Sequence, residues 1–466
     1  MIKFYVTNLP AIILFGRRQM NSIKLMLRRS VLRSVLYSAF FLVVCSLQAQ
    51  KLLTLEDAVS IALKNNYDIQ LSKNDSAIAA LDYSYRNWLF APRLNASVSN
   101  VWNNNHQNQE FSNGTTKEGK VTTDNLAGSV TLSWLLFDGG KMFVTRNQAQ
   151  ELVRLGEMTI KDQVVNTVAQ VINSYYIVVR QKQQLKAIEE QMSISQTRVD
   201  LSQRRLEIGV GNKPDVLQGK VDLNAQIASR FRQLTLIEEL KERLNQTMNA
   251  AVGTNYEVSD SIPFNNNLTL AQIQNNFEET NTTLQLQKKN IDLAELTVKS
   301  RKADQFPLIS FNSAYNYNRT NNNVTLNPAL PLYNRNRGYN YGFSASIPIL
   351  NYRNTNRLIK QSKLDLSYQQ LVYESQKSTL NLNVINFFKE YELQKKMLDL
   401  EEANILLAKE NVNIQLELFR LGSSTIIQLR DAQFSLADAY DRLIAARYNT
   451  KLAETELMRL KGELIR

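Results

Sequence analysis

The sequence predicts a mainly α-helical protein with a small antiparallel β part. Three observations predict it: spans of up to about 70 residues that lack helix breakers, four segments of alternating hydrophobicity, and an internal duplication. The predicted architecture is a long coiled-coil α-helical barrel continuous with a transmembrane β-barrel. Each chain contributes four strands and two structural repeats to this shared structure.

The helices are predicted from where Gly and Pro are missing. Lys141–Ile208 contains only Gly156, and Tyr352–Leu421 contains neither Gly nor Pro. Three shorter spans are similar: Asp215–Ala251, Leu268–Phe306 and Ser423–Lys461. All are rich in good helix formers. In the first span, apolar residues recur every three or four positions, at Val164, Val168, Val171, Tyr175 and Val178. This spacing predicts coiled-coil packing.

Four segments instead alternate between apolar and small polar residues, at about 93–103, 126–137, 308–318 and 339–350. Strands with one apolar face and one polar, water-exposed face are typical of outer-membrane barrels. A soluble antiparallel sheet with one wet face is the alternative. The polar stretches Asn103–Asn125 and Arg319–Arg337 are predicted to be long loops on one side. Long polar loops on one side of the sheet are typical of outer-membrane barrels, so they favour the barrel over the soluble sheet.

An internal duplication connects these segments. Corresponding motifs lie 215 or 213 residues apart, as for Thr54 and Thr269, Pro92 and Pro307, and Gly209 and Gly422. The chain therefore divides into a first repeat, 50–267, and a second, 268–466. Each is expected to contain helix, strand, loop, strand, long helix, turn and helix.

Helix lengths give a geometric expectation. A 68-residue helix over Lys141–Ile208 is about 100 Å long. The chain is expected to return in two stacked pieces of 37 residues, Asp215–Ala251 and Leu268–Asp304. Thr54–Trp88 and the C-terminal helix would do the same for the second repeat. Four strands cannot close a barrel, and open edges in lipid leave backbone groups unsatisfied. The chain is therefore expected to oligomerise.

The N-terminus predicts export. Residues 1–49 contain seven basic residues and no acid, so the formal charge of +12 falls to +5 over 50–466. Basic residues precede a run of about ten apolar residues that leads to Ala49, as in a secretory signal peptide. A membrane anchor is the alternative, but spanning needs about 20 residues. Acylation of Cys45 is a second alternative, and the true start codon stays open.

Composition excludes most enzymes. With one His and one Cys among 466 residues, no zinc site, catalytic triad or disulfide framework is expected. No phosphate-binding glycine loop occurs either. We expect no catalytic residue, cofactor, metal or nucleic-acid partner. His106 is predicted to be solvated in a loop, and Lys241 and Arg243 to lie on solvated helix faces.

Several motifs, in this order and spacing, resemble the TolC-type outer-membrane efflux protein family. They are Thr54–Ala58 with Ala62–Tyr67, Ala91-Pro92, Leu136–Gly140, and the paired turns Gly209–Val216 and Gly422–Leu429. The resemblance implies a homotrimer with a 12-stranded barrel in outer-membrane lipid and a tunnel through the periplasm. It further implies docking to a periplasmic adaptor (membrane fusion) protein and an inner-membrane transporter.

The function expected from the resemblance is a passive exit duct of a tripartite efflux or type I-like secretion system. The alternative is a periplasmic or surface coiled-coil protein, structural or adhesive, without a pore. The exported substrate and the class of pump are not determined by the sequence.

The resemblance also implies site residues. Two helical tips would meet the adaptor, at Gly209, Val210, Gly211, Gly422, Ser423 and Ser424. The family often narrows the tunnel with two carboxylates just past the second tip. The matching positions here are Gln428 and Asp431, so Asp431 is the stronger candidate. Asp215 matches Gln428 in the first repeat, either as a helix N-cap alone or as a cap that also contributes to gating.

Overall fold

The computed structural model describes residues 52–265, 267–275, 277–327 and 329–464. The predicted signal peptide, 1–49, and Cys45 lie outside the described residues. The described chain forms two compact units. In the smaller unit, β1 (Leu52–Leu53) and β4 (Glu257–Val258) pair in parallel, and Leu53 and Val258 are buried.

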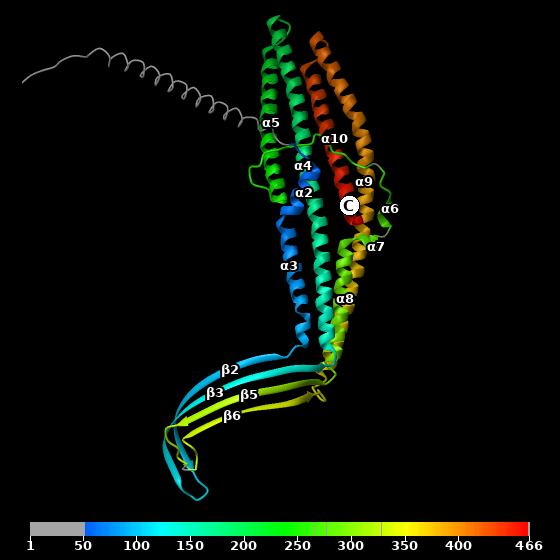
Figure 1. Ribbon diagram of the computed structural model, residues 1–466. Coiled ribbons are helices and arrows are strands. Elements are labelled where there is room, and N and C mark those ends of the chain that lie inside the picture. The colour runs from blue at the N-terminus through cyan, green and yellow to red at the C-terminus, as the bar shows by residue number, and fades with distance from the viewer. Residues whose placement is uncertain (1–51, 266, 276, 328, 465–466) are drawn as a thin grey trace, which may run out of the picture. The chain divides into compact units, whose positions relative to one another are not determined.

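Two very long helices dominate the larger unit (Figure 1). They are α4 (Lys141–Glu207) with 67 residues and α9 (Asn354–Leu421) with 68. Each packs against the helix that follows its turn, α5 (Lys213–Met248) or α10 (Ile426–Lys461), and α4 also contacts α10. The predicted coiled-coil seam is confirmed in its buried members, Val168, Val171, Tyr175 and Val178.

The shorter helices differ from the prediction. The expected single helix over Leu268–Asp304 is wrong: α6 (Leu270–Gln274), α7 (Phe277–Thr280) and α8 (Thr282–Ala303) take its place. Thr54–Trp88 is likewise broken into α2 (Leu55–Asn65), α3 (Tyr67–Ser84) and a 3₁₀ turn, η1 (Arg86–Phe90). Asn66 and Asn281 have non-helical backbone conformations and cap the next helix, so each interrupts the continuous helix that was predicted.

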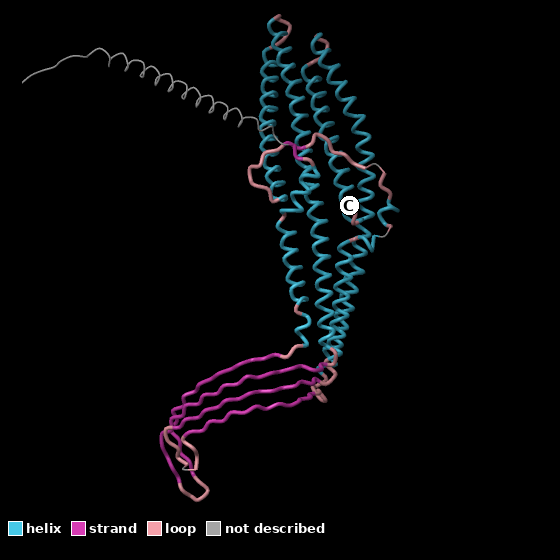
Figure 2. Tube along the Cα trace, in the orientation of Figure 1, coloured by secondary structure: helices cyan, strands magenta, loops and turns pink. Residues whose placement is uncertain are grey.

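Four antiparallel strands form the larger sheet, in the order β2-β3-β5-β6 (Figure 2). Their bounds are β2 (Arg93–Glu110), β3 (Thr116–Asp138), β5 (Leu308–Asn322) and β6 (Tyr333–Ser346). The register places apolar pairs on one face: Leu94 opposite Leu132, Val130 opposite Tyr315, and Phe311 opposite Phe343. The other face has small polar pairs, Ser97 with Ser129 and Ser310 with Ser344, whose hydroxyls are 2.8 Å apart.

The predicted long loops are largely wrong. Strands β2 and β3 stay paired until Glu110 meets Thr116, so most of Asn103–Asn125 is sheet. In the same way, β5 continues to Asn322 and β6 begins at Tyr333, so both ends of the predicted Arg319–Arg337 loop are strand. Both faces of these extensions are polar, so the hydrophobic alternation that marks a strand disappears while the backbone ladder continues. His106 lies in β2, exposed, with Nε2 2.6 Å from Glu118 Oε1.

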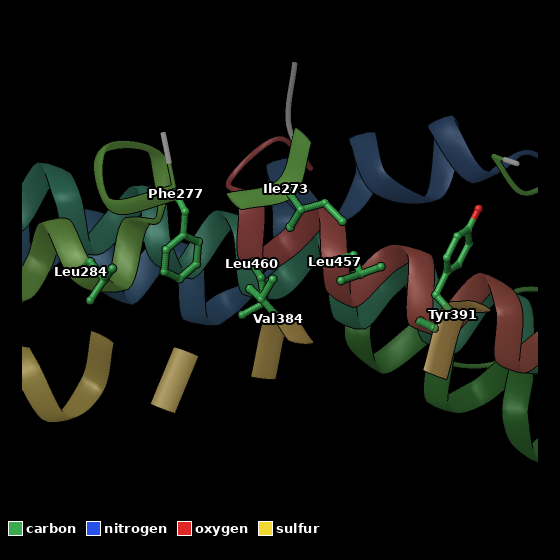
Figure 3. Close-up of a cluster of buried hydrophobic side chains, with 8 residues drawn as sticks. Ile273, Phe277, Leu284, Val384, Tyr391, Leu457 and Leu460 are labelled. Atoms are coloured by element: carbon green, nitrogen blue, oxygen red, sulfur yellow. The ribbon is translucent and has the colours of Figure 1, made fainter. Parts of the chain in front are cut away.

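The short helices α6 and α7 contribute Ile273 and Phe277 to an apolar cluster with α8, α9 and α10 (Figure 3). Its other members are Leu284, Val384, Tyr391, Ala453, Leu457 and Leu460. One predicted solvated residue is corrected here: Lys241 of α5 is buried, with Nζ 3.1 Å from Glu238 Oε1. Arg243 is exposed, as predicted.

Candidate functional site

The two turns that end α4 and α9 are the predicted tips. In the first, Gly209 has φ +79°, a left-handed conformation that glycine adopts without strain. The amides of Val210 and Gly211 both donate to the Arg205 carbonyl, at 3.0 and 2.9 Å. A Cβ on Gly211 would lie 2.9 Å from the Arg205 backbone, so this position requires glycine for close approach.

Helix α5 then begins at Lys213, with Asn212 as its N-cap. The Asn212 side-chain oxygen accepts a hydrogen bond from the Asp215 amide at 2.9 Å. The prediction that Asp215 is the N-cap is therefore wrong. Asparagine caps as well as aspartate, and Pro214 is tolerated in the first helical turn, so the N-cap lies three residues earlier, at Asn212. Asp215 is half-buried in that turn.

The second tip has the same backbone design. Gly422 has φ +83°, and the amides of Ser423 and Ser424 donate to the Leu418 carbonyl at 2.9 and 3.2 Å. Thr425 caps α10, and Gln428 completes a capping box by accepting from the Thr425 amide at 2.9 Å. The structure thus gives Gln428 a local structural contact.

The predicted adaptor-contact residues differ in exposure. Val210 is 63% exposed, and Gly209, Gly422 and Ser423 are also exposed. Ser424 is buried, and its hydroxyl donates to Gln415 Oε1 at 2.8 Å and lies 3.1 Å from Gln428 Oε1. Its side chain is therefore used within the turn.

Asp431 lies exposed on α10, one helical turn beyond the capping box. The described residues contain no group of three or more His, Cys, Asp or Glu placed to hold a metal ion. The turns bring Ser424, Thr425 and Gln428 together, whereas the two acids stand on separate helices.

Two contacts join the α4–α5 hairpin to the α9–α10 hairpin, and neither could be predicted from the sequence. Arg205 Nη1 of α4 donates to the Phe419 carbonyl of α9 at 3.1 Å. Its guanidinium carbon lies 4.9 Å from the centre of the buried Phe419 ring, a cation–π distance. The internal duplication shows that the turns after α4 and α9 are equivalent in sequence. No local sequence pattern, however, indicates that the two turns contact each other.

The second missed contact joins α4, α5 and α10. Arg198 is 1% exposed, and its Nη2 lies 2.6 Å from Asp222 Oδ2. Its Nη1 donates to Gln433 Oε1 at 2.9 Å. A buried guanidinium is stable only when paired, so this contact fixes the α4–α5 hairpin against α10.

In the part of the chain that the structure describes, no helix has the length and hydrophobicity needed to cross a membrane.

Comparisons with known proteins agree with this arrangement. The chain matches the family described as outer membrane efflux protein over residues 58–250 and 273–463. It is 20% identical over 365 residues to the outer membrane protein TolC of Vibrio cholerae, covering 73% of this chain and 78% of that protein.

Solved structures show the same fold. The outer membrane protein VceC from Vibrio cholerae has a TM-score of 0.70 at 12% identity, over 88% of this chain and 96% of that one. The CmeC outer membrane channel of Campylobacter jejuni has a TM-score of 0.69 at 14% identity, over 88% and 85%. The family match covers both long helices and all four strands of the larger sheet. The chain therefore belongs to the outer membrane efflux protein family, a family of channel proteins, and is an exit duct of the outer membrane.

Proposed function

We propose that three copies of this chain form the duct, which docks a periplasmic adaptor and an inner-membrane pump through its helical tips. The observation that carries this proposal is the second apolar face of α9. On the first face, Tyr391, Leu398, Ile405 and Val412 are buried within the chain at heptad spacing. Two positions after each of them, Leu393, Leu400, Leu407 and Ile414 are 51 to 65% exposed.

Residues two apart on a helix point in nearly opposite directions. Helix α9 is therefore apolar on both sides, which is the pattern of a coiled-coil helix with two neighbours. Helix α5 also exposes Leu217, Val221 and Phe231. We assign these two faces to contact between copies, α9 of one against α5 of the next.

The sheet supports the same assembly. Strands β2 and β6 are its edges, and within the described part of the chain each has one side unpaired. Unpaired backbone groups are costly in lipid, so the edges must pair with other copies. Apolar side chains such as Val98, 79% exposed, would then face lipid, while the serine pairs face the bore. Three four-stranded sheets give a barrel of about 12 strands, within the known range.

The proposed duct also includes the two helical tips, which would contact the adaptor, and a constriction just past them. Val210 and Ser423 present exposed side chains for adaptor hairpins, and Gly209, Gly211 and Gly422 shape the turns. Asp431 is the proposed charged constriction, and Asp215, in the first turn of α5, is proposed to contribute to it from the first tip. The two-repeat division at 267/268 is also proposed, on the basis of the matching turns. Energy must come from the partner pump.

Replacing Leu400 and Leu407 with Asp tests the assembly. The double variant should migrate as a monomer in native electrophoresis in mild detergent and give no stable conductance in planar bilayers. The matched control, Gln370→Asp with Asn413→Asp, adds the same charge to exposed α9 positions outside the apolar stripe. It should stay trimeric and conduct. A monomeric, non-conducting wild type would instead favour the coiled-coil scaffold or adhesin.

A further inference from the structure

A polar site away from the tip turns lies where α4, α5 and α10 meet. It is a cavity of about 130 Å³ whose polar lining includes Gln191, Ser195, Arg198, Asp222, Arg430 and Gln433. The cavity spans both repeats, because α4 and α5 precede the sheet's second hairpin and α10 follows it.

The buried side chains of this cavity have unused hydrogen-bond donors. Arg198, Gln191 and Gln433 are 1, 5 and 6% exposed. Among the described residues, Nε of Arg198, Nε2 of Gln191 and Nε2 of Gln433 are buried without a partner, as is Nε of Arg430. Each such N–H group costs about 1–3 kcal/mol if nothing accepts its proton.

The acceptor oxygens of Gln433 and Asp222, in contrast, are occupied. Gln433 Oε1 accepts from Arg198 Nη1 at 2.9 Å, and Asp222 Oδ2 lies 2.6 Å from Arg198 Nη2. The other carboxylate oxygen, Oδ1, accepts from Gln218 Nε2 at 2.8 Å. Two guanidinium groups and one carboxylate leave the lining with a net formal charge of +1. The cavity therefore lacks one negatively charged acceptor.

We propose that this cavity binds a small monovalent inorganic anion of the size of chloride. The volume accommodates such an ion with a few waters, since each water takes about 30 Å³ in the liquid. A more highly charged oxyanion would exceed the positive charge available and face the carboxylate of Asp222. The bound ion would join the donors of Gln191 and Arg198 on α4 to those of Arg430 and Gln433 on α10.

Thermal unfolding of the mature protein in detergent tests binding directly. Unfolding followed by circular dichroism, with sodium chloride replacing sodium gluconate at constant ionic strength, should show a saturable rise in midpoint of at least about 2 °C. Crystals soaked in sodium bromide should show an anomalous scattering peak in the cavity. Neither measurement depends on conduction, so a failure here leaves the duct function untouched.

Gln433→Glu is the sharpest variant. It keeps an oxygen for Arg198 Nη1 and replaces the unpaired Nε2 with a second carboxylate oxygen, so the built-in charge should take the place of the anion. The chloride-dependent rise should be lost, while the matched change Gln361→Glu at an exposed α9 position should retain it. Gln191→Leu removes one donor and should weaken chloride binding roughly tenfold without adding charge.

The proposal is overturned if chloride and gluconate give the same midpoint for the wild type, or if no bromide peak lies in the cavity. An equal response of the wild type and Gln433→Glu would place the chloride effect elsewhere, with the same consequence. If Gln433→Glu does not fold, Gln191→Leu decides: an unchanged chloride dependence in that variant also overturns the proposal.

Discussion

The side-chain amide of Asn281 donates a hydrogen bond to the Leu460 carbonyl, 2.9 Å away, at the point where α8 meets the end of α10. Asn66 makes the same contact, also at 2.9 Å, with the Thr247 carbonyl near the end of α5. The two asparagines are 215 residues apart and their acceptors 213 apart, which are the offsets of the duplicated motifs. Each asparagine also caps the helix that follows it. One side chain therefore ends one helix, starts the next and ties both to a third.

Replacing Asn281 separates these two roles. Asn281→Ala loses the cap and leaves the Leu460 carbonyl without its donor, and should lower the free energy of unfolding by about 2 kcal/mol. Asn281→Ser keeps a capping oxygen and should lose about half of that. Thermal unfolding followed by circular dichroism provides the comparison. Equal losses in the two variants would show that the cap contributes nothing.

Breaking the Arg205 contact should favour opening at the tips. Arg205→Met keeps the length of the side chain but cannot donate to the Phe419 carbonyl. Losing about 1 kcal/mol of contact shifts an open–closed equilibrium about fivefold. Single-channel recordings should show a higher open probability. Arg204→Met, an exposed neighbour on α4, is the control and should behave as the wild type. Identical recordings for both variants would remove Arg205 from the gate.

Asp431 can be tested by removing its charge alone. Asp431→Asn keeps the size of the side chain, and in a trimer it removes three negative charges from the proposed constriction. Cation block in planar bilayers should weaken, whereas Asp438→Asn, an exposed acid two turns further along α10, should leave it unchanged. Unaltered block and conductance in Asp431→Asn would show that this carboxylate is not at the constriction.

Asp260 links the segment before α6 to α4. Its carboxylate oxygens lie 2.8 Å from Lys182 Nζ and 2.7 Å from Lys186 Nζ. These hydrogen bonds, that of Lys182 first, hold the pKa of Asp260 below its ordinary value. A lowered pKa stabilises the folded state above about pH 4, the ordinary value, and this contribution is lost as the pH falls through the lowered pKa.

Asp260→Asn should therefore cost less than about 1 kcal/mol at pH 7, because the carboxylate is largely exposed. The difference in unfolding midpoint from the wild type should shrink as the solution is acidified below pH 4. A difference that stays constant through the acid range would contradict the ion-pair explanation.

Parts of the fold could be predicted because they repeat locally. The seam of α4 and the alternation of Leu94, Ala96 and Val98 are written in consecutive turns or consecutive residues. The polar strand extensions were missed because both of their faces are wet, so no alternation marks them. The breaks at Asn66 and Asn281 were missed because an asparagine within a Gln- and Leu-rich run resembles its surroundings until its partner carbonyl is known.

Local sequence patterns suffice to predict the two long helices, the four places where strands form, the glycines of both tips and the family. Tertiary structure alone decided the partners: Arg198 with Asp222 and Gln433, Arg205 with Phe419, and the burial of Lys241 and Ser424. The difference lies in how far apart along the sequence the interacting residues are. Helix and strand periodicities arise between residues a few positions apart, whereas Arg198 and Gln433 are 235 positions apart and meet only when the two repeats pack.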